Sequence, residues 1–454
     1  MAAIRHVAVI DLGKTNAKVA LFDLDTQHEI EKFTMPNHVL NDGPYPHFDT
    51  DALWAFMLRS LASLASKVDA ISITTHGASA ALLDADGALA LPVLDYEYAG
   101  PESLAEEYNR QRPPFSETGA PRLPIGLNLG AQIYWQQKAF PEHFAKVRWI
   151  VTYPQYWAHR LCGVLANEAT SLGCHTDLWA YAKADYSTMV DRMGWRKLMP
   201  PLRKASDVLG GLLPDLARQT GLSVQTPIYC GIHDSNASLY PHLLAGREKL
   251  SVVSTGTWVI GMAIGADATA LDPARDVLVN VNALGEPVPS ARFMGGREFQ
   301  LLATEFGGSP SVADAEAVIT KHAMLVPSVV TGCGPFPDRK MQWLNADAIT
   351  PAQRQICVSF YLGLMTATCL ELIGAQGDVI VEGPFSENQF YLQMLAAATQ
   401  RNVLLSPASN TGTTLGAALL ASKDAGPMTY QASTIAAPAN SDNYIELWRA
   451  ALKA

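Results

Sequence analysis

The sequence feature that most constrains the fold is a strand–turn–strand pattern that occurs twice, once near the start of each half of the chain. Residues 7–22 contain an apolar, largely β-branched run, a glycine-containing turn and a returning apolar run. Residues 250–264 repeat this order of residue types. The repetition predicts two domains of related architecture, residues 1–245 and 246–454, with a boundary near Gly246.

Strands and helices alternate along the rest of the chain, which predicts an α/β fold. Short apolar runs predict further strands at residues 71–75, 82–83, 228–230, 379–381 and 403–405. Apolar periodicity predicts helices at residues 51–66, 130–139, 351–373, 388–399 and 413–422. Thr50 and Asp51 are expected to supply the N-cap of the first helix, because their side-chain oxygens accept from free backbone N–H groups.

The composition argues against several functions. The 454 residues carry a net charge of −10, whereas binding to nucleic acid or to an anionic membrane requires a basic face. The six cysteines are scattered without a CxxC pair, as expected for reduced, buried thiols. Asp11 interrupts the N-terminal apolar run, so no signal peptide is expected. The apolar stretch at 357–373 is short and contains Glu371, which predicts a buried helix in a cytoplasmic protein.

The first turn has the sequence Asp-Leu-Gly-Lys-Thr-Asn, beginning at Asp11. Its Gly-Lys-Thr is not a Walker A motif, because Ala8 occupies the first glycine position and a strand follows instead of a helix. We interpret the turn as a phosphate-binding hairpin, in which Gly13 lets the backbone bend toward an anion and Thr15 and Asn16 donate hydrogen bonds. Asp11 can hold a hydrated Mg²⁺ ion. An ordinary hairpin turn is the alternative for this segment alone.

The second turn, Ser-Thr-Gly-Thr at residues 254–257, again combines a glycine with hydroxyls. Two such hairpins can grip the phosphates of one nucleotide, although a threonine-rich turn is the alternative. Asp234 follows the strand predicted at 228–230, and α/β proteins place their sites beyond the carboxyl ends of strands. It can accept the proton of an attacking hydroxyl in phosphoryl transfer. Alternatively, Asp234 or Ser235 caps the following helix.

Other polar segments suit the recognition of a sugar. They are His76 with Gly77 after a strand, Asp95 and Glu97 on either side of a tyrosine, and His175 in a run rich in hydrogen-bonding side chains. A loop histidine or a surface acid is the alternative for each of them.

Residues 382–388, Glu-Gly-Pro-Phe-Ser-Glu-Asn, follow a predicted strand. Gly383 in this segment would let an adenine ring approach the backbone, and a plain strand-to-helix connection is the alternative. The sequence contains no HExxH, EF-hand or paired-cysteine motif and no GxGxxG fingerprint.

Taken in order, these segments resemble the FGGY family of carbohydrate kinases. The turn at 11–16 is similar to the family's first phosphate motif, residues 254–258 to its second, and Gly-Ile-His-Asp-Ser at 231–235 to the segment with its catalytic aspartate. Residues 168–179 and 294–298 resemble the branch of rhamnulose, fuculose and xylulose kinases. The resemblance covers nearly the whole chain. It implies a two-domain, actin-like (ribonuclease H-like) ATPase fold of the α/β class, with the active site in the interdomain cleft.

The resemblance also implies the cofactors ATP and Mg²⁺, Asp234 as the catalytic base and Asp11 as the Mg²⁺ ligand, acting through water. The residues that it implies for the sugar are His76, Gly77, Asp95, Glu97, His175 and Asp234. Those that it implies for the nucleotide are Gly13, Lys14, Thr15, Asn16, Thr255, Gly256, Thr257, Gly296, Gly383, Pro384 and Asn388.

The implied reaction is ATP-dependent phosphorylation of a hydroxyl of a small sugar, a ketose such as L-fuculose, L-rhamnulose or xylulose. Residues 1–245 are expected to bind sugar and phosphate, and residues 246–454 the nucleotide. The sequence departs from the family at Pro384-Phe385, where small residues are usual, and at Glu97, where many members have arginine. A nucleotide-dependent binding protein or a sugar sensor on the same fold is the alternative. The expected partners are the sugar and ATP, without nucleic acid or membrane, and a homodimer is one candidate assembly.

Overall fold

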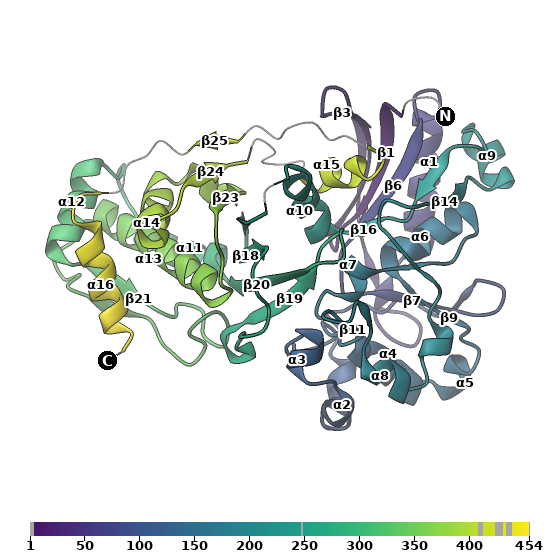
Figure 1. The fold of residues 1–454 in the computed structure, drawn as a ribbon, viewed down its shortest axis with the longest axis horizontal. Coiled ribbons are helices and arrows are strands. Elements are labelled where there is room, and N and C mark those ends of the chain that lie inside the picture. Colours follow the sequence, from purple (N-terminus) through teal and green to yellow (C-terminus); the bar gives the residue numbers. More distant parts are fainter. Residues whose placement is uncertain (1–3, 247, 407–411, 423–429, 433–437, 454) are drawn as a thin grey trace. The chain divides into compact units, whose positions relative to one another are not determined.

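The computed structural model describes residues 4–246, 248–406, 412–422, 430–432 and 438–453. The chain divides into two compact units, and Figure 1 shows the elements of each. The first unit consists of Met1–Gly246, Val279–Pro287 and Thr411–Met428. The second consists of Arg247–Leu278, Val288–Asn410 and Thr429–Ala454. Each unit is therefore assembled from three segments of the chain.

A mixed seven-stranded sheet organises the first unit. Its strands are β1 (His6–Leu12), β2 (Asn16–Asp23), β3 (His28–Pro36), β6 (Ala70–Thr75), β14 (Val208–Gly211), β15 (Pro227–Tyr229) and β16 (Ile232–His233). Their order is β14-β15-β6-β1-β2-β3, and β16 also pairs with β6. β1, β6, β15 and β16 run parallel, whereas β2 is antiparallel to both of its neighbours. The predicted first hairpin, β1 to β2, is confirmed.

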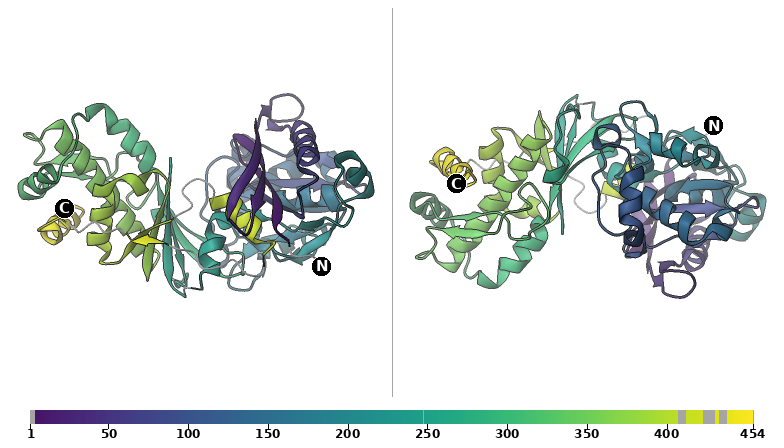
Figure 2. Two further views of the ribbon diagram at one scale, coloured as in Figure 1. Left: turned by 90° about the horizontal axis from the view of Figure 1, so that it is seen from above. Right: turned by 90° about the horizontal axis from the view of Figure 1, so that it is seen from below.

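Helices cover both faces of this sheet. They are α1 (Thr50–Leu64), α6 (Tyr153–Cys162), α9 (Pro214–Thr220), α10 (Asp234–Leu244) and α15 (Gly412–Leu419). Alternate residues of a strand point to opposite faces. In β6, Ile71 and Ile73 join the apolar core shared with α1 and α6, whereas Ser72 donates a 2.6 Å hydrogen bond to Ala417 O in α15. α15 packs against α10, and Figures 1 and 2 show the yellow α15 beside the purple β1.

The N-cap predicted for α1 is wrong by one or two positions. Thr50 is already the first helical residue, and Asp49 is the cap, with its side chain accepting from Ala52 N at 2.9 Å. The chain carries three consecutive oxygen-bearing side chains here, and only the backbone conformation decides which of them lies outside the first turn.

The remainder of the first unit contains a second apolar core. Its strands are β4 (Val39–Leu40), β5 (His47–Phe48), β7 (Ala80–Leu83), β8 (Leu89–Leu91), β9 (Trp149–Thr152), β10 (Asn167–Glu168), β11 (Trp179–Ala180), β12 (Asp185–Tyr186) and β13 (Leu202–Arg203). Its helices are α2 (Ala105–Gln111), α3 (Phe115–Thr118), α4 (Leu129–Ala139), α5 (Pro141–Phe144), α7 (Ala169–Leu172) and α8 (Thr188–Arg192). Leu129, Trp135, Trp179 and Trp195 are among the buried side chains of this core.

The second unit repeats the sheet pattern of the first. Its sheet contains the strands β17 (Leu250–Thr255), β18 (Val259–Ile264), β19 (Val277–Val281), β20 (Pro287–Phe293), β23 (Asp378–Glu382), β24 (Val403–Leu405) and β25 (Gln431–Ala432). Their order is β19-β20-β18-β17-β23-β24-β25. Of these strands, the end of β19 from Val279 and the first residue of β20, Pro287, are counted with the first unit. β17 pairs antiparallel with β18 and parallel with β23, as β1 does with β2 and β6. The second predicted hairpin is therefore confirmed, and both hairpins have the same place in their sheets.

Five α-helices accompany this sheet in the part of the second unit that the structure describes: α11 (Gly295–Leu302), α12 (Val312–Lys321), α13 (Pro351–Leu372), α14 (Gln389–Thr399) and α16 (Ser441–Ala451). The short pair β21 (Met324–Val326) and β22 (Gln342–Leu344) completes it. By length and composition alone, α13 could span a membrane, but 78% of its most apolar window is buried. It is the buried helix predicted there.

Candidate active site

Asp11, His76 and Asp234 lie at one edge of the first sheet because of strand register. In the pairing of β1 with β6, Asp11 lies opposite Thr74 and Leu12 opposite Thr75. In the pairing of β16 with β6, Ile232 and His233 lie opposite the same two threonines. These parallel strands therefore end together, and the residues at their ends meet at one edge, where α/β sheets place their sites.

Asp234 is the first residue of α10, and its side chain is 34% exposed. Its Oδ1 accepts from Ser235 N at 2.6 Å and from Ser235 Oγ at 3.3 Å. The N-cap position belongs to His233, so neither of the two residues weighed as a cap occupies it. Within the described residues, the hydrogen bonds to this carboxylate use Oδ1, which leaves Oδ2 for a ligand hydroxyl.

His233 supports this carboxylate from the buried side. Its Nε2 lies 3.1 Å from Asp234 Oδ1. Burial alone would lower the pKa of His233, but the Cys174 sulfur and the Asp234 and Glu168 carboxylates outweigh it and raise the pKa to about 9. The imidazole of His233 therefore lies against the Asp234 carboxylate in surroundings that favour its protonated form.

A buried network fixes His233 in place. The backbone N–H of His233 donates to Thr170 Oγ1 at 3.0 Å, and Thr170 Oγ1 donates to Glu168 Oε2 at 2.5 Å. Burial raises the pKa of Glu168 to about 7. Gly77 also belongs to this network through packing, because a Cβ on Gly77 would lie 2.7 Å from His233 Nε2. Gly77 was predicted to bind sugar. The close approach of the His233 ring is a structural reason for a glycine at this position.

Asp11 lies at the end of β1 next to a lysine. Lys18 Nζ is 3.7 Å from Asp11 Oδ2, and it also donates to Glu29 Oε1 at 2.9 Å and Thr414 Oγ1 at 2.5 Å. Burial raises the pKa of Asp11 to about 6 against the effect of Lys18, and the charge of Asp234 adds to the rise. A cation beside Asp11 would offset the unfavourable burial of its negative charge.

The residues present fit Mg²⁺ as an ion held largely by water. The described residues contain no group of three or more His, Cys, Asp or Glu side chains that could hold a metal. Mg²⁺ is commonly bound through one or two carboxylates, several waters and substrate phosphates. The partly exposed Asp11 carboxylate provides such a ligand.

The tip of the first hairpin is held by Asn37. Asn37 Nδ2 donates to Gly13 O at 2.8 Å, and Asn37 N donates to Thr15 O at 2.9 Å. The Gly13 N–H is occupied by Asn16 O at 2.9 Å. Thr15 and Asn16 are exposed. Their side chains, together with the open tip, therefore remain the predicted phosphate ligands of this hairpin.

His76 is a buried, neutral imidazole at the end of β6. Its Nδ1 bonds to Gly77 O at 2.9 Å, and its ring packs against Phe48, Tyr96 and Tyr153. Burial lowers the pKa of His76 to about 4. Its Nε2 is buried and has no hydrogen-bond partner among the described residues. Such an atom is costly unless a ligand satisfies it, so it suits a sugar hydroxyl.

Lys14 lies among the residues predicted to bind sugar. Its ammonium contacts Asp95 Oδ1, lies 3.4 Å from Glu97 Oε2, and sits over the rings of Phe48 and Tyr96. Lys14 was predicted to belong to the nucleotide-binding residues. In the structure its ammonium is engaged with the carboxylates instead.

His175 has a left-handed backbone with φ of 42°, and its Nδ1 bonds to Leu127 O at 2.8 Å. The ring is half-buried. Both His175 and His233 lower the pKa of the buried Cys174 thiol to about 5, although burial alone would raise it. Contact of His175 with a sugar stays a prediction.

In the second unit, Thr255 and Gly383 join the end of β17 to the segment that follows β23. Thr255 Oγ1 donates to Glu382 O at 2.5 Å and accepts from Phe385 N at 3.1 Å. Gly383 has φ of 81°, and a Cβ there would lie 2.0 Å from Thr255 O. Close approach of two backbone segments therefore requires this glycine, and we need no adenine ring to explain it. Gly256 and Thr257, at the tip of the hairpin, are exposed.

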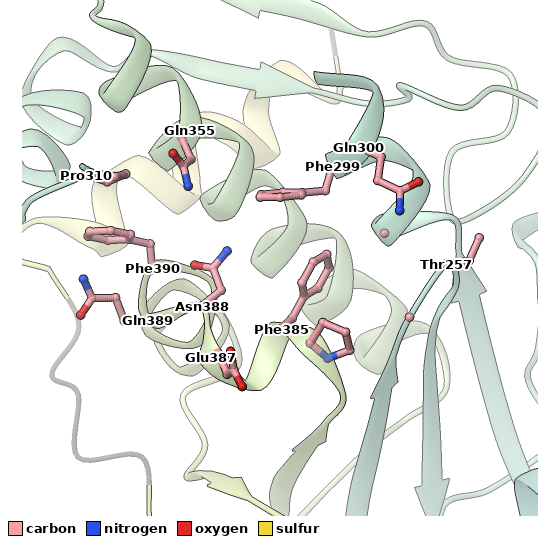
Figure 3. Close-up of a pocket in the computed structure, with 13 residues that line it drawn as sticks. Thr257, Phe299, Gln300, Pro310, Gln355, Phe385, Glu387, Asn388, Gln389 and Phe390 are labelled. Atoms are coloured by element: carbon pink, nitrogen blue, oxygen red, sulfur yellow. The ribbon is translucent and has the colours of Figure 1, made fainter. Parts of the chain in front are cut away.

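These two exposed residues line a pocket of about 670 Å³ in the second unit (Figure 3). Its lining residues are Gly256, Thr257, Gly296, Phe299, Gln300, Pro310, Gln355, Pro384, Phe385, Glu387, Asn388, Gln389 and Phe390. The pocket brings together Gly256, Thr257, Gly296, Pro384 and Asn388 from the predicted nucleotide set. Asn388 also caps α14, where its Oδ1 accepts from Tyr391 N at 3.1 Å.

Of the aromatic residues of this pocket, Phe385 was noted in the sequence, whereas Phe299 and Phe390 were not predicted to line it. Figure 3 shows Phe299, Phe385 and Phe390 around its interior. The positions of Phe299 and Gln300 could have been found, because they lie three and four residues after Gly296 on one helix. His233, Thr170 and Glu168 were missed because their contacts join segments far apart in the sequence.

Two family models match the chain. One, described as the FGGY family of carbohydrate kinases, N-terminal domain, matches residues 6–240, and the other, carbohydrate kinase FGGY, C-terminal domain, matches residues 247–429. An L-fuculokinase of Salmonella typhi is 25% identical over 269 residues, which are 56% of this chain and 56% of that protein. A rhamnulokinase of Pectobacterium atrosepticum is 23% identical over 369 residues, 78% of this chain and 71% of that protein. The chain thus spans little more than half the length of the fuculokinase that it matches.

Solved structures agree over nearly the full length. A carbohydrate kinase from Novosphingobium aromaticivorans is 34% identical with a TM-score of 0.90 and 99% of both chains covered. A xylulose kinase from Lactobacillus acidophilus is 17% identical with a TM-score of 0.77, over 99% of this chain and 98% of that one. The predicted two-domain, actin-like fold is confirmed. The chain therefore belongs to the FGGY family of carbohydrate kinases.

Proposed function

We propose that the protein transfers the γ-phosphoryl group of ATP to a hydroxyl of a small neutral sugar, with Asp234 as the general base. The observation that carries this proposal is the meeting of Asp11, His76 and Asp234 at one sheet edge. A carboxylate with one oxygen free, a buried imidazole atom without a partner and a second carboxylate for a metal are the groups that phosphorylation of a sugar hydroxyl needs.

The acceptor hydroxyl is proposed to donate its hydrogen bond to Asp234 Oδ2. His233 and Ser235 hold Oδ1, so the carboxylate keeps one orientation as the hydroxyl oxygen attacks. Asp234 takes the proton as the new O–P bond forms and ADP leaves. His76 Nε2 and the carboxylate of Asp95 would bind other hydroxyls of the sugar. Fixing the acceptor in this way accounts for catalysis by positioning, on which phosphoryl transfer largely depends.

The pocket of the second unit is proposed to bind the adenosine of ATP. Its walls combine phenylalanine rings with amide and backbone groups, a composition typical of nucleotide sites. Phe299 is half-buried and offers a ring against which a purine can stack, and the buried Phe385 and Phe390 supply apolar wall. Gly256 and Thr257 would receive the phosphate end. Gly13, Thr15 and Asn16 stay the proposed phosphate ligands of the first hairpin.

Mg²⁺ would supply charge neutralisation of the phosphates, and Asp11 would hold it. Removal of divalent cations with EDTA is expected to abolish ADP release, and added Mg²⁺ is expected to restore it. Asp11→Asn should raise the Mg²⁺ concentration for half-maximal rate by about tenfold, because one charge-assisted contact is lost. Titration of the rate with Mg²⁺ measures this. An unchanged Mg²⁺ dependence would exclude Asp11 as the ligand.

Gly256→Val is expected to weaken ADP binding by about tenfold or more, because the new side chain enters the pocket. A Cβ at Gly256 would lie 3.9 Å from Trp258 O, so the fold has room for it. Calorimetry with ADP gives the Kd. The matched control is Gly210→Val in β14 of the first unit, where the nearest atom to a Cβ is 3.6 Å away and ADP binding should not change. Equal ADP affinity in both variants would place the nucleotide elsewhere.

The proposal itself is tested by ADP release across a panel of acceptors: L-fuculose, L-rhamnulose, xylulose and ribulose, with sugar acids and polyols beside them. Acceptor-dependent ADP release at a rate well above that with ATP alone is the expected result. Tight ADP binding without release on any acceptor would favour a nucleotide-dependent binding protein or a sugar sensor.

A further inference from the structure

Lys14 was predicted to bind the nucleotide, but its ammonium contacts Asp95 and Glu97, which were predicted to bind the sugar. It lies in the turn between β1 and β2, which is predicted to bind phosphate. Its side chain is 18% exposed, and the ammonium is surrounded by two carboxylates and two aromatic rings. Asp95 is in direct contact, Glu97 Oε2 is 3.4 Å away, and the ring centres of Phe48 and Tyr96 lie at 5.0 and 4.9 Å.

We propose that Lys14 is a specificity-determining residue of the acceptor site, where it holds Asp95 and Glu97 as a hydroxyl-binding group that selects neutral sugars over sugar acids. This inference rests on the proposed kinase function and deepens it. It gives the acceptor a chemical class, and it moves Lys14 from the predicted nucleotide-binding residues to the acceptor site.

The burial of Asp95 keeps Lys14 in place. Asp95 is 7% exposed, and its Oδ1 also accepts from Glu97 N at 3.1 Å. If the ammonium moved to a phosphate, a buried carboxylate would lose its only cationic partner among the described residues. Leaving a buried charge unpaired is strongly unfavourable. The cation–π contacts with Phe48 and Tyr96 hold the ammonium from two further sides.

The same aromatic pair connects Lys14 to the acceptor groups. The Phe48 ring centre is 4.9 Å from that of His76, and the Tyr96 ring centre is 5.4 Å from it. His76 carries the unpaired Nε2 that suits a sugar hydroxyl. Lys14 and His76 therefore pack on the same two rings, in the part of the site that the acceptor would occupy.

The charges of the cluster define the acceptor. Lys14 offsets one of the two carboxylates that it touches, so the group formed by Lys14, Asp95 and Glu97 keeps a net negative charge. Carboxylates accept hydrogen bonds from sugar hydroxyls and repel the carboxylate of a sugar acid. The side chain of Glu97 is 60% exposed and is free to meet the ligand.

The test measures the acceptor KM and the Kd for ADP separately in each variant. In Lys14→Met, the KM for the best neutral acceptor should rise about tenfold or more, and the Kd for ADP alone should stay within about twofold. Lys14→Arg keeps the charge and should recover most of the acceptor affinity. Lys67→Met, which removes an exposed lysine paired with Glu31 at 3.0 Å, is the control and should change neither value. If Lys14→Met folds poorly, the double variant Lys14→Met with Asp95→Asn removes both charges, and its acceptor KM should exceed that of Asp95→Asn alone.

The Glu97→Gln variant tests the preference for neutral sugars over sugar acids. Removing one negative charge should raise the ratio of kcat/KM for gluconate to kcat/KM for the neutral acceptor about fivefold. A weaker ADP Kd with an unchanged acceptor KM in Lys14→Met would overturn the inference, as would unchanged values throughout. The acceptor KM of Lys14→Met and the kcat/KM ratio of Glu97→Gln can be interpreted only if the wild-type protein shows acceptor-dependent ADP release. Its absence would instead overturn the proposed kinase function, so the two failures are distinguishable.

Discussion

Asp234→Asn is expected to lower kcat for phosphoryl transfer by about 10²–10⁴-fold, the range that a positioned general base contributes. The amide has the shape of the carboxylate, so its oxygen can still accept from Ser235 N, but it cannot take the proton of the acceptor hydroxyl. The Kd for ADP should be nearly unchanged, because Asp234 belongs to the first unit and the proposed adenosine pocket to the second. Single-turnover measurements with the best acceptor give the rate.

Asp215→Asn is the matched control. Asp215 is also in the first turn of a helix, α9, but its side chain is 86% exposed. It should keep wild-type kcat. If Asp234→Asn retained a kcat within a few fold of the wild type, the base would have to be another group.

Gly416→Ala is expected to destabilise the protein more than any other glycine-to-alanine change in α15. A Cβ at Gly416 would lie 1.6 Å from Ala237 O, a backbone atom of α10, so the two helices would have to move apart. Overpacking of this kind lowers the free energy of unfolding by about 1–3 kcal/mol, and occasionally by more. Since α10 begins at Asp234, the displacement should also reduce kcat in the molecules that remain folded.

Gly412→Ala in the same helix provides the comparison. Its nearest contact would be 3.8 Å from Ser238 Oγ, an ordinary van der Waals distance. Its effect on the free energy of unfolding should stay within about 1 kcal/mol. Urea unfolding of both variants measures the difference. Equal stabilities would show that α15 does not pack as closely on α10 as the structure indicates.

Much of the fold could be predicted from local sequence. The two hairpins were found because a β-branched run, a glycine turn and a second apolar run are all local signals. The long helix at 351–373 was found because its length and apolar character are unambiguous, and the structure places it at Pro351–Leu372. The cap of α1 was misplaced, because neighbouring residues of the same chemistry compete for one position and the backbone dihedrals choose between them.

The candidate site was predictable to a lesser degree. Asp11 and His76 directly follow predicted strands, which pair in parallel. Asp234 was expected after a strand at 228–230, whereas the strand that places it at this edge is the short β16, which was not predicted. The partners of these residues were not predictable. Lys14 was assigned by the motif around it, whereas its contacts come from a segment about eighty residues later. Gly383 was assigned to a ligand, whereas the carbonyl of Thr255 explains it.

The sequence by itself determined the two related α/β halves and the residues that end their strands, because strand periodicity and turn chemistry are properties of neighbouring residues. The tertiary structure decided which charges are paired and which polar atoms are left for a ligand. Asp95 engages Lys14, His233 supports Asp234, and His76 Nε2 has no partner in the described chain. These outcomes depend on burial and on contacts between distant segments, which no local pattern records.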